Sequence, residues 1–169
     1  MKEITLHNKT FEVFIPETEI AAIVDTIANN INSTKIKDPL FIAVMNGAFL
    51  FAADVMRKIT IPNTEISFIK LASYSGTQTT GEVSELIGIG QNIKRRNVII
   101  LEDIIDTGIT IEKIISLLEK EEVADIKVAT LLFKPDAYTK DINIDFVVGY
   151  GLDYDKLGRN LPHIYKLKE

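Results

Sequence analysis

The sequence contains no cysteine, and this absence excludes both disulfide bonds and zinc sites built on thiolates. Long hydrophobic runs are missing as well. No apolar stretch approaches the ~20 residues that a membrane-spanning helix requires, and the first residues mix charged with apolar side chains. We therefore expect a cytoplasmic protein without a membrane partner.

Positive charge is also in short supply. Lysine and arginine together number 19 and aspartate and glutamate 24, which gives a net charge of −5. Affinity for duplex nucleic acid comes mainly from basic residues that neutralise phosphates, so this balance argues against a general nucleic-acid binder. It does not exclude a small anionic substrate, because a local site can be positive or can use the charge of a metal ion.

Two familiar phosphate-binding motifs are absent. The pattern G-x-x-x-x-G-K-[ST] does not occur, which excludes a P-loop enzyme. Gly88 and Gly90 lack the third glycine and the helix start of a dinucleotide-binding fingerprint. Any phosphate site must therefore use another arrangement.

What the chain does contain is a regular alternation of two periodicities. Apolar spacings of three and four predict helices over 17–31, over 48–59 and after residue 110. Short apolar runs predict strands over 40–44, 66–71, 98–101, 126–132, 146–148 and 164–167. This order indicates an α/β fold, a doubly wound and mainly parallel sheet with helices on both faces. We expect a single domain, residues 1–169, with a small hood formed by about 1–15 and 150–169.

The most informative segment begins at Val98. A buried strand leads directly into two adjacent carboxylates, Glu102 and Asp103, hereafter the acidic pair. Unpaired buried carboxylates are costly, so the pair must lie where the strand leaves the sheet, or be paired. Open α/β sheets bind ligands at the carboxyl ends of their strands. Two carboxylates in that place suit ribose hydroxyls or a hydrated Mg²⁺.

The next residues, Asp106–Thr110, form what we call the phosphate turn. Gly108 permits a positive φ and a close approach of the backbone, while free N–H groups and the helix dipole attract an anion. Thr107 and Thr110 add hydroxyl donors. Asp106 or Thr107 could instead simply cap the helix. The complete string exceeds what capping requires, so we interpret it as a site for a phosphorylated ribose.

The string from Glu102 to Thr110 resembles the phosphoribosyl-pyrophosphate signature of type I phosphoribosyltransferases, in particular their hypoxanthine-guanine branch. Three further segments match in order. Val44–Gly47 resembles the pyrophosphate loop, Ser73-Tyr74 the catalytic lid, and Phe146–Tyr154 with Arg159 the purine-binding end. The resemblance implies transfer of a 5-phosphoribosyl group from phosphoribosyl pyrophosphate to N9 of hypoxanthine or guanine. It also implies Mg²⁺ as cofactor and a homodimer or homotetramer.

The resemblance further implies a role for each matching residue. The ribose and its phosphate would be held by Glu102, Asp103, Asp106, Thr107, Gly108, Ile109 and Thr110. Mg²⁺ would be held by the acidic pair, and a second ion by Asp153. Pyrophosphate would be held by backbone N–H groups at Asn46 and Gly47, where mammalian members have lysine-glycine, and by Arg159. The Arg159 turn could equally be ordinary polar surface.

The purine and the reacting atoms are assigned in the same way. Asp106 would face N7 of the base as general base or acid. Lys134 would contact the purine O6 and so select oxo over amino purines, although a lysine after a strand is often only solvated. Phe146 would stack on the base, Val147 would contact its edge, and Asp153 would also belong to the purine-binding residues. Phe146 and Val147 can equally belong to a core strand. The catalytic lid, Ser73 and Tyr74, would exclude water from the reacting carbon.

Two alternative functions remain open at this point. One is a phosphoribosyltransferase for another base, such as xanthine or adenine, although Lys134 argues against adenine. The other is a nucleic-acid-binding regulator that has kept the fold, which the acidic balance disfavours. His7 and His163 show no metal-ligand spacing, and we interpret both as structural or incidental.

Overall fold

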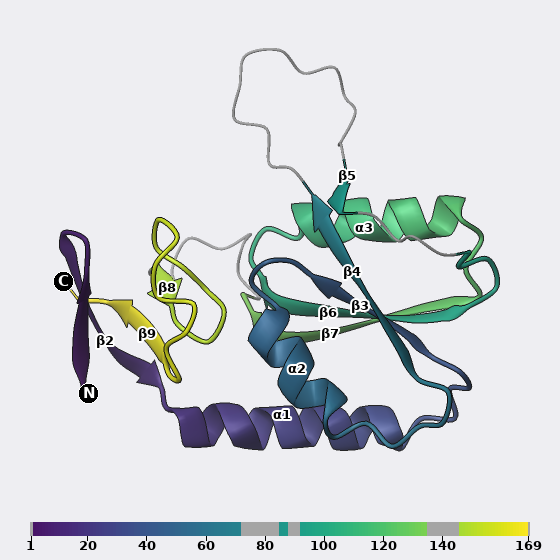
Figure 1. Cartoon of the computed structure of the whole chain (residues 1–169), viewed down its shortest axis with the longest axis horizontal. Helices are drawn as coiled ribbons and strands as arrows, with labels where there is room; N and C mark the ends of the chain where they lie inside the picture. Colours follow the sequence, from purple (N-terminus) through teal and green to yellow (C-terminus); the bar gives the residue numbers. More distant parts are fainter. Residues whose placement is uncertain (1, 72–84, 88–91, 135–145, 169) are drawn as a thin grey trace, which may run out of the picture.

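The computed structural model describes residues 2–71, 85–87, 92–134 and 146–168, and it contains two β-sheets side by side (Figure 1). The larger sheet has the strand order β5 (Glu85–Ile87), β4 (Glu65–Leu71), β3 (Leu40–Val44), β6 (Asn97–Ile105) and β7 (Asp125–Phe133). The smaller sheet has the order β1 (Glu3–Leu6), β2 (Lys9–Ile15), β9 (Ile164–Leu167) and β8 (Val147–Val148).

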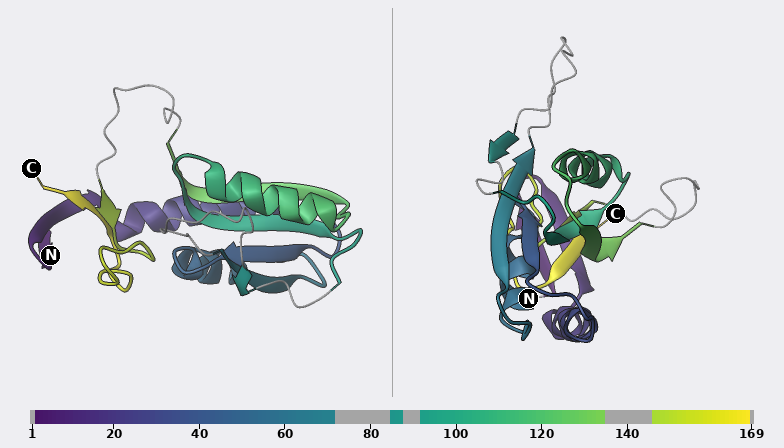
Figure 2. Two further views of the ribbon diagram at one scale, coloured as in Figure 1. Left: turned by 90° about the horizontal axis from the view of Figure 1, so that it is seen from above. Right: turned by 90° about the vertical axis from the view of Figure 1, so that its right-hand side faces the viewer.

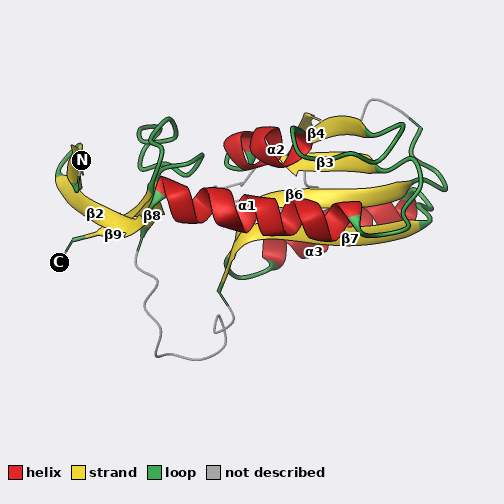
Figure 3. Ribbon diagram, turned by 90° about the horizontal axis from the view of Figure 1, so that it is seen from below, coloured by secondary structure: helices red, strands yellow, loops and turns green. Residues whose placement is uncertain are grey.

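Helices cover both faces of the larger sheet. Strands β4, β3, β6 and β7 are parallel, and β5 joins the edge antiparallel to β4. Helices α1 (Glu17–Asn32) and α2 (Phe49–Met56) lie on one face and α3 (Ile109–Lys120) on the other (Figures 2 and 3). Every residue of β3 is buried, as expected for a central strand covered from both sides. The predicted doubly wound α/β fold is confirmed.

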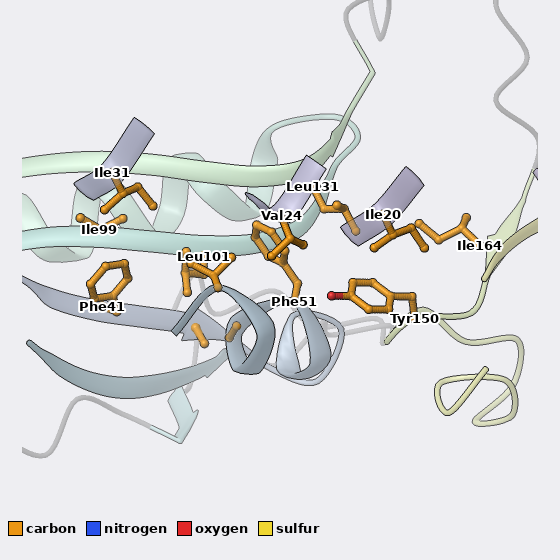
Figure 4. Packing of buried hydrophobic residues seen from close by; sticks show 13 residues of the cluster. Ile20, Val24, Ile31, Phe41, Phe51, Ile99, Leu101, Leu131, Tyr150 and Ile164 are labelled. Carbon is orange, nitrogen blue, oxygen red and sulfur yellow. The ribbon is translucent and has the colours of Figure 1, made fainter. Parts of the chain in front are cut away.

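The two faces have separate apolar cores. On the α1 side, Ile20, Val24 and Ile31 pack against Phe41 and further strand residues. On the other side, residues of α3 pack against the alternate residues of β3 and β6. The first core does not end at the larger sheet, because Tyr150 and Ile164 extend it toward the smaller one (Figure 4). Apolar packing therefore links the two sheets.

The smaller sheet, hereafter the hood, is antiparallel and brings the two ends of the chain together. It lies beyond the carboxyl ends of the parallel strands (Figure 1). The two histidines make local contacts here: the N–H of Glu17 at the start of α1 donates to Nδ1 of His163 at 2.9 Å, and His7 Nε2 lies 3.3 Å from the carbonyl oxygen of Asp155. These contacts are structural, as the sequence interpretation expected.

Two element boundaries differ from the predictions. Helix α2 ends at Met56 because the N–H groups of Lys58 and Ile59 bond to carbonyls only three residues back, so the chain continues as tighter turns. Strand β6 continues to Ile105, four residues beyond the predicted end, because β7 remains paired beside it. Within the described residues, no helix is long and apolar enough to cross a membrane.

Candidate active site

The acidic pair lies at the point where β6 loses one of its two neighbours. β3 pairs with β6 only as far as Leu101, whereas β7 accompanies β6 to Ile105. Glu102 and Asp103 therefore belong to the strand and are only 7% and 6% exposed. The sequence predicts that the pair lies where the strand leaves the sheet. This is wrong on the β7 side, where the pairing continues to Ile105, and right on the β3 side, where it ends at Leu101. The sheet opens here, at its carboxyl end, where such folds bind ligands.

Glu102 is a buried acid whose environment disfavours its charged form. Its Oε2 is buried and has no hydrogen-bond partner among the described residues. Burial, together with the adjacent Asp103, raises the pKa of Glu102 to about 9. A buried oxygen without a partner normally costs about 1–3 kcal/mol and calls for an explanation, such as a ligand that supplies the missing partner.

The phosphate turn has an open helix start. Gly108 is the N-cap of α3 and has φ +81°, the left-handed conformation that its lack of a side chain permits. No side-chain cap bond is formed at α3, and Thr107 Oγ1 lies only at the limit, 3.5 Å from the N–H of Ile109. The interpretation of Asp106 or Thr107 as simple caps is therefore not supported. The first N–H groups of α3 remain available to an anion.

The loop between β3 and α2, residues Met45–Ala48, is hereafter the strand-end loop. It contains a cis peptide between Met45 and Asn46. Gly47 lies directly against the acidic pair, since a Cβ added there would be 1.8 Å from Oδ2 of Asp103. On its other side, a Cβ added to Gly151 would be 2.0 Å from the carbonyl oxygen of Gly47. Only glycine fits at both positions, and the two contacts join β6, this loop and the hood.

The segment from Gly149 to Arg159, hereafter the hood loop, brings Asp153 and Arg159 into the same region. Arg159 Nη2 lies 2.5 Å from Asp153 Oδ1, and Arg159 Nη1 donates to the carbonyl oxygen of Gly151 at 2.5 Å. Asp153 also accepts a hydrogen bond from the N–H of Lys156 at 2.7 Å. Asp153 is thus engaged with an arginine in this structure, while Arg159 is anchored next to the strand-end loop.

Tyr150 fastens the hood loop to α2. Its hydroxyl donates to Asp54 Oδ2 at 2.6 Å, and Asp54 also forms an ion pair with Arg57 at 2.7 Å. Burial and the neighbouring Asp54 carboxylate raise the pKa of Tyr150 above its ordinary value. The tyrosine therefore stays protonated and remains a donor. Sequence reasoning did not assign Tyr150 or Asp54, because the bond joins residues far apart in the chain.

Removing this hydroxyl gives a first testable prediction. Tyr150→Phe should lower the free energy of unfolding by about 1–3 kcal/mol, because the partly buried carboxylate of Asp54 loses its hydrogen bond from the tyrosine. Tyr154→Phe is the matched control, since that hydroxyl bonds to Asn8 at 3.0 Å in an exposed position. Urea unfolding of both variants measures the difference. Equal losses, or no loss in Tyr150→Phe, would contradict a fastening role.

Asp106 and Lys134 come together at the end of the β6–β7 pair. Lys134 Nζ lies 3.1 Å from Asp106 Oδ1, with side-chain exposures of 24% and 56%. The backbone N–H of Lys134 donates to the carbonyl oxygen of Ile105 at 3.0 Å, which fixes the start of the lysine next to the phosphate turn. Lys134 is therefore more than a freely solvated lysine after a strand.

Of the remaining predicted residues, two belong to the hood and two lie outside the described part of the chain. Phe146 is 47% exposed and contacts hood residues: its ring centroid is 6.3 Å from that of Phe11 and 5.3 Å from that of Tyr154. Val147 begins β8 and is half-buried. Ser73 and Tyr74 lie outside the described residues.

The residues present fit a magnesium ion shared with a substrate. Mg²⁺ is usually held by one or two carboxylates together with substrate oxygens, and it retains several waters. The acidic pair offers two adjacent carboxylates, one with an unpartnered oxygen. No cluster of three or more histidine, aspartate or glutamate side chains suited to a metal occurs in the described part of the chain.

The fold and the site define a class of protein: an α/β protein whose ligand site lies at the carboxyl edge of a parallel sheet. The phosphoribosyl transferase domain family matches residues 16–155, and the chain belongs to this family. Relatives named as phosphoribosyltransferases cover nearly the whole chain.

Two curated relatives carry the name hypoxanthine-guanine phosphoribosyltransferase. The protein of Staphylococcus aureus strain Mu50 is 35% identical over 96% of this chain and 97% of its own length. That of Staphylococcus epidermidis strain RP62A is 36% identical over the same shares.

Solved structures of named phosphoribosyltransferases have the same fold as this chain. The hypoxanthine-guanine phosphoribosyltransferase of Bacillus anthracis superposes with a TM-score of 0.83 at 35% identity, covering 93% of this chain and 98% of that one. The hypoxanthine phosphoribosyltransferase of Trypanosoma cruzi gives 0.82 at 28% identity, covering 98% and 95%.

Proposed function

We propose that the protein is a hypoxanthine phosphoribosyltransferase of purine salvage that also accepts guanine. It would transfer the 5-phosphoribosyl group of phosphoribosyl pyrophosphate to N9 of the base and release pyrophosphate, giving IMP or GMP. The observation that carries the proposal is the Asp106–Lys134 pair, 3.1 Å apart beside the phosphate turn. A 6-oxopurine presents a proton at N7 and an acceptor at O6, and this pair offers one partner for each.

In the proposed reaction, the bond from N9 to C1 of the ribose forms as the bond from C1 to pyrophosphate breaks. Positive charge develops on the ribose, so positioning and electrostatics contribute more than a covalent nucleophile. The phosphate turn holds the 5′-phosphate at the start of α3, and this contact fixes C1 relative to the base. Asp106 accepts the N7 proton, while Lys134 moves from the carboxylate to the purine O6.

The acidic pair would hold the ribose hydroxyls and the cofactor. Mg²⁺, when bound, neutralises charge on the pyrophosphate leaving group. The partnerless Oε2 of Glu102 supports this assignment, because a hydroxyl or a cation would supply what the protein does not. Asn46, Gly47 and Arg159 would hold pyrophosphate between the strand-end loop and the hood loop, with Asp153 orienting Arg159 or taking a second ion.

The base and the lid complete the proposal. Phe146 and Val147 would contact the purine from the hood side, with Phe146 turning from its hood neighbours onto the base. Ser73 and Tyr74 would close over the reacting carbon. We also propose one domain over residues 1–169 and a cytoplasmic location.

We extend the proposal to self-association as a homodimer or homotetramer. Ile66 and Phe68 of β4 lie on the same face of the sheet as α1 and α2, but these helices leave them 38% and 42% exposed, and Phe49 of α2 is 37% exposed. An uncovered apolar face of this kind suits contact with a second copy. Light scattering after size-exclusion chromatography measures the assembly, and a monomeric mass at micromolar concentration would contradict this part.

A comparison of bases tests the function. With phosphoribosyl pyrophosphate and Mg²⁺, kcat/KM for hypoxanthine and guanine should exceed that for adenine by about 10⁴-fold, because the amino group of adenine would meet the Lys134 ammonium without accepting its hydrogen bond. Pyrophosphate release measures all four rates, with xanthine as the fourth base. Adenine at a comparable rate would overturn the assignment of Lys134. Xanthine as the only substrate would overturn the choice of base.

A further inference from the structure

Lys70, at the end of β4, reaches the strand-end loop from the neighbouring strand. Its Nζ lies 3.4 Å from Oδ1 of Asn46. The loop is tied to β4 directly before this lysine, because the N–H of Met45 donates to the carbonyl oxygen of Ile69 at 2.8 Å. The position of Lys70 relative to the loop is therefore fixed by backbone pairing and does not depend on its long side chain alone.

The contact leaves the charge of Lys70 directed at the loop. Among the side chains that the structure describes, its partner is the neutral amide oxygen of Asn46 and not a carboxylate. Two other strand lysines differ in this respect: Lys127 on β7 lies 2.8 Å from Asp125, and Lys166 on β9 lies 3.2 Å from Glu12. An ammonium held by a neutral amide keeps its positive potential available to an anion.

The loop itself is built for an anion but carries no charged side chain. Helix α2 begins directly after it, with no side-chain cap and no acidic residue in its first turn. The N–H of Phe49 bonds to the carbonyl oxygen of Asn46 at 3.4 Å, so the positive dipole end of α2 lies directly at the loop. Gly47 is confined between Asp103 and Gly151, so the backbone of the loop is held in place. On the hood side Arg159 is already paired with Asp153, so a multiply charged ligand on the β4 side of the loop still lacks a cation.

We propose that Lys70 supplies this cation and binds the pyrophosphate group against the strand-end loop. The inference rests on the proposed function, in which this loop holds pyrophosphate. Asn46 positions the ammonium in the free protein, and a diphosphate oxygen replaces the amide oxygen when ligand binds. The charge that the strand-end loop lacks therefore comes from the adjacent strand, next to Asn46.

The test compares Lys70→Ala and Lys70→Arg with Lys127→Ala, which removes the same charge from a strand position paired with Ile99, in the amino-terminal part of β7. Lys70→Ala should raise KM for phosphoribosyl pyrophosphate about tenfold, as expected for loss of one charge-assisted contact. KM for hypoxanthine and kcat should change less than twofold. Lys70→Arg should restore most of the affinity, and Lys127→Ala should behave as the unmodified protein.

Calorimetric titration with pyrophosphate and Mg²⁺ separates this inference from the proposed function. Pyrophosphate binding that weakens in Lys70→Ala supports Lys70 even if no purine is converted. Unchanged KM and unchanged pyrophosphate affinity in Lys70→Ala would overturn it. Equal effects in Lys127→Ala would also overturn it, because they would show a general effect of net charge. A parallel rise in both KM values would overturn it as well, because it would show a general effect on folding. Thermal unfolding identifies a variant that fails to fold, and Lys70→Gln then replaces Lys70→Ala.

Discussion

Asp106→Asn is expected to reduce kcat with hypoxanthine by about 10²–10⁴-fold, the range that one positioned proton acceptor contributes. Affinity for phosphoribosyl pyrophosphate should change little. Asparagine keeps the size of the side chain and the backbone of the phosphate turn, whose N–H groups bind the 5′-phosphate. What it removes is the carboxylate that would take the proton from N7.

The ion pair with Lys134 adds a second consequence. In the free protein the ammonium at 3.1 Å holds Asp106, so the base is available only after Lys134 has found another acceptor. The purine O6 provides this acceptor, and recognition of the oxo group thereby releases the base. Lys134→Met should accordingly raise KM for hypoxanthine and reduce discrimination against adenine, whereas Asp106→Asn acts on kcat.

The two effects can be separated by measurement. Single-turnover rates report the chemical step, and calorimetric titration reports the affinity for phosphoribosyl pyrophosphate. Thr110→Ser serves as the control in the same turn, because it retains the hydroxyl and no proton transfer depends on it. If Asp106→Asn weakened binding as much as it slowed turnover, the role of Asp106 would be limited to shaping the phosphate turn.

The sequence predicts the phosphate turn well because its physics is local. A glycine before a helix with free N–H groups requires only its immediate neighbours, and Gly108 indeed has φ +81° at the start of α3. The alternation of apolar periods likewise predicts a mainly parallel sheet, although it does not predict the order of the strands. The helix 17–31 and the strand 40–44 agree with α1 and β3 to within one residue.

Contacts between distant segments could not be predicted in this way. The length of β6 depends on how far β7 accompanies it, and no pattern within residues 98–105 reports that. The fit of Gly47 between Asp103 and Gly151 joins three segments of the chain. Lys70 resembles any surface lysine at a strand end until the pairing of β3 with β4 brings Asn46 beside it.

The second large effect concerns Glu102 and has opposite signs for binding and for stability. Glu102→Gln should abolish detectable binding of phosphoribosyl pyrophosphate with Mg²⁺, because the site loses the charge that would hold the cation and ribose. At pH 8 and above, the same change should raise the free energy of unfolding by about 1–3 kcal/mol, since folding must return a proton to Glu102 or bury its charge, whereas glutamine requires neither. Binding sites commonly retain such destabilising groups.

The pH dependence follows from the direction of the pKa shift. Burial and the adjacent Asp103 raise the pKa of Glu102 from 4.5 to about 9, so between these values the folded protein holds a proton that the unfolded chain has lost. The contribution of Glu102 to stability is therefore fully present below pH 4.5 and is lost as pH rises toward 9. The free energy of unfolding of the unmodified protein should fall relative to that of Glu102→Gln across this window. Urea titrations at several pH values measure the difference.

Ligand binding supplies the complementary test. A cation favours the charged carboxylate, so binding of phosphoribosyl pyrophosphate with Mg²⁺ at pH 7.5 should release a proton from Glu102. Calorimetry in buffers of different ionisation enthalpy counts the proton. Glu119→Gln, an exposed change on α3, should match the unmodified protein in stability, binding and proton release. A Glu102→Gln protein that still binds with Mg²⁺, or a parallel pH profile in both proteins, would show that the buried oxygen serves the fold and not the ligand.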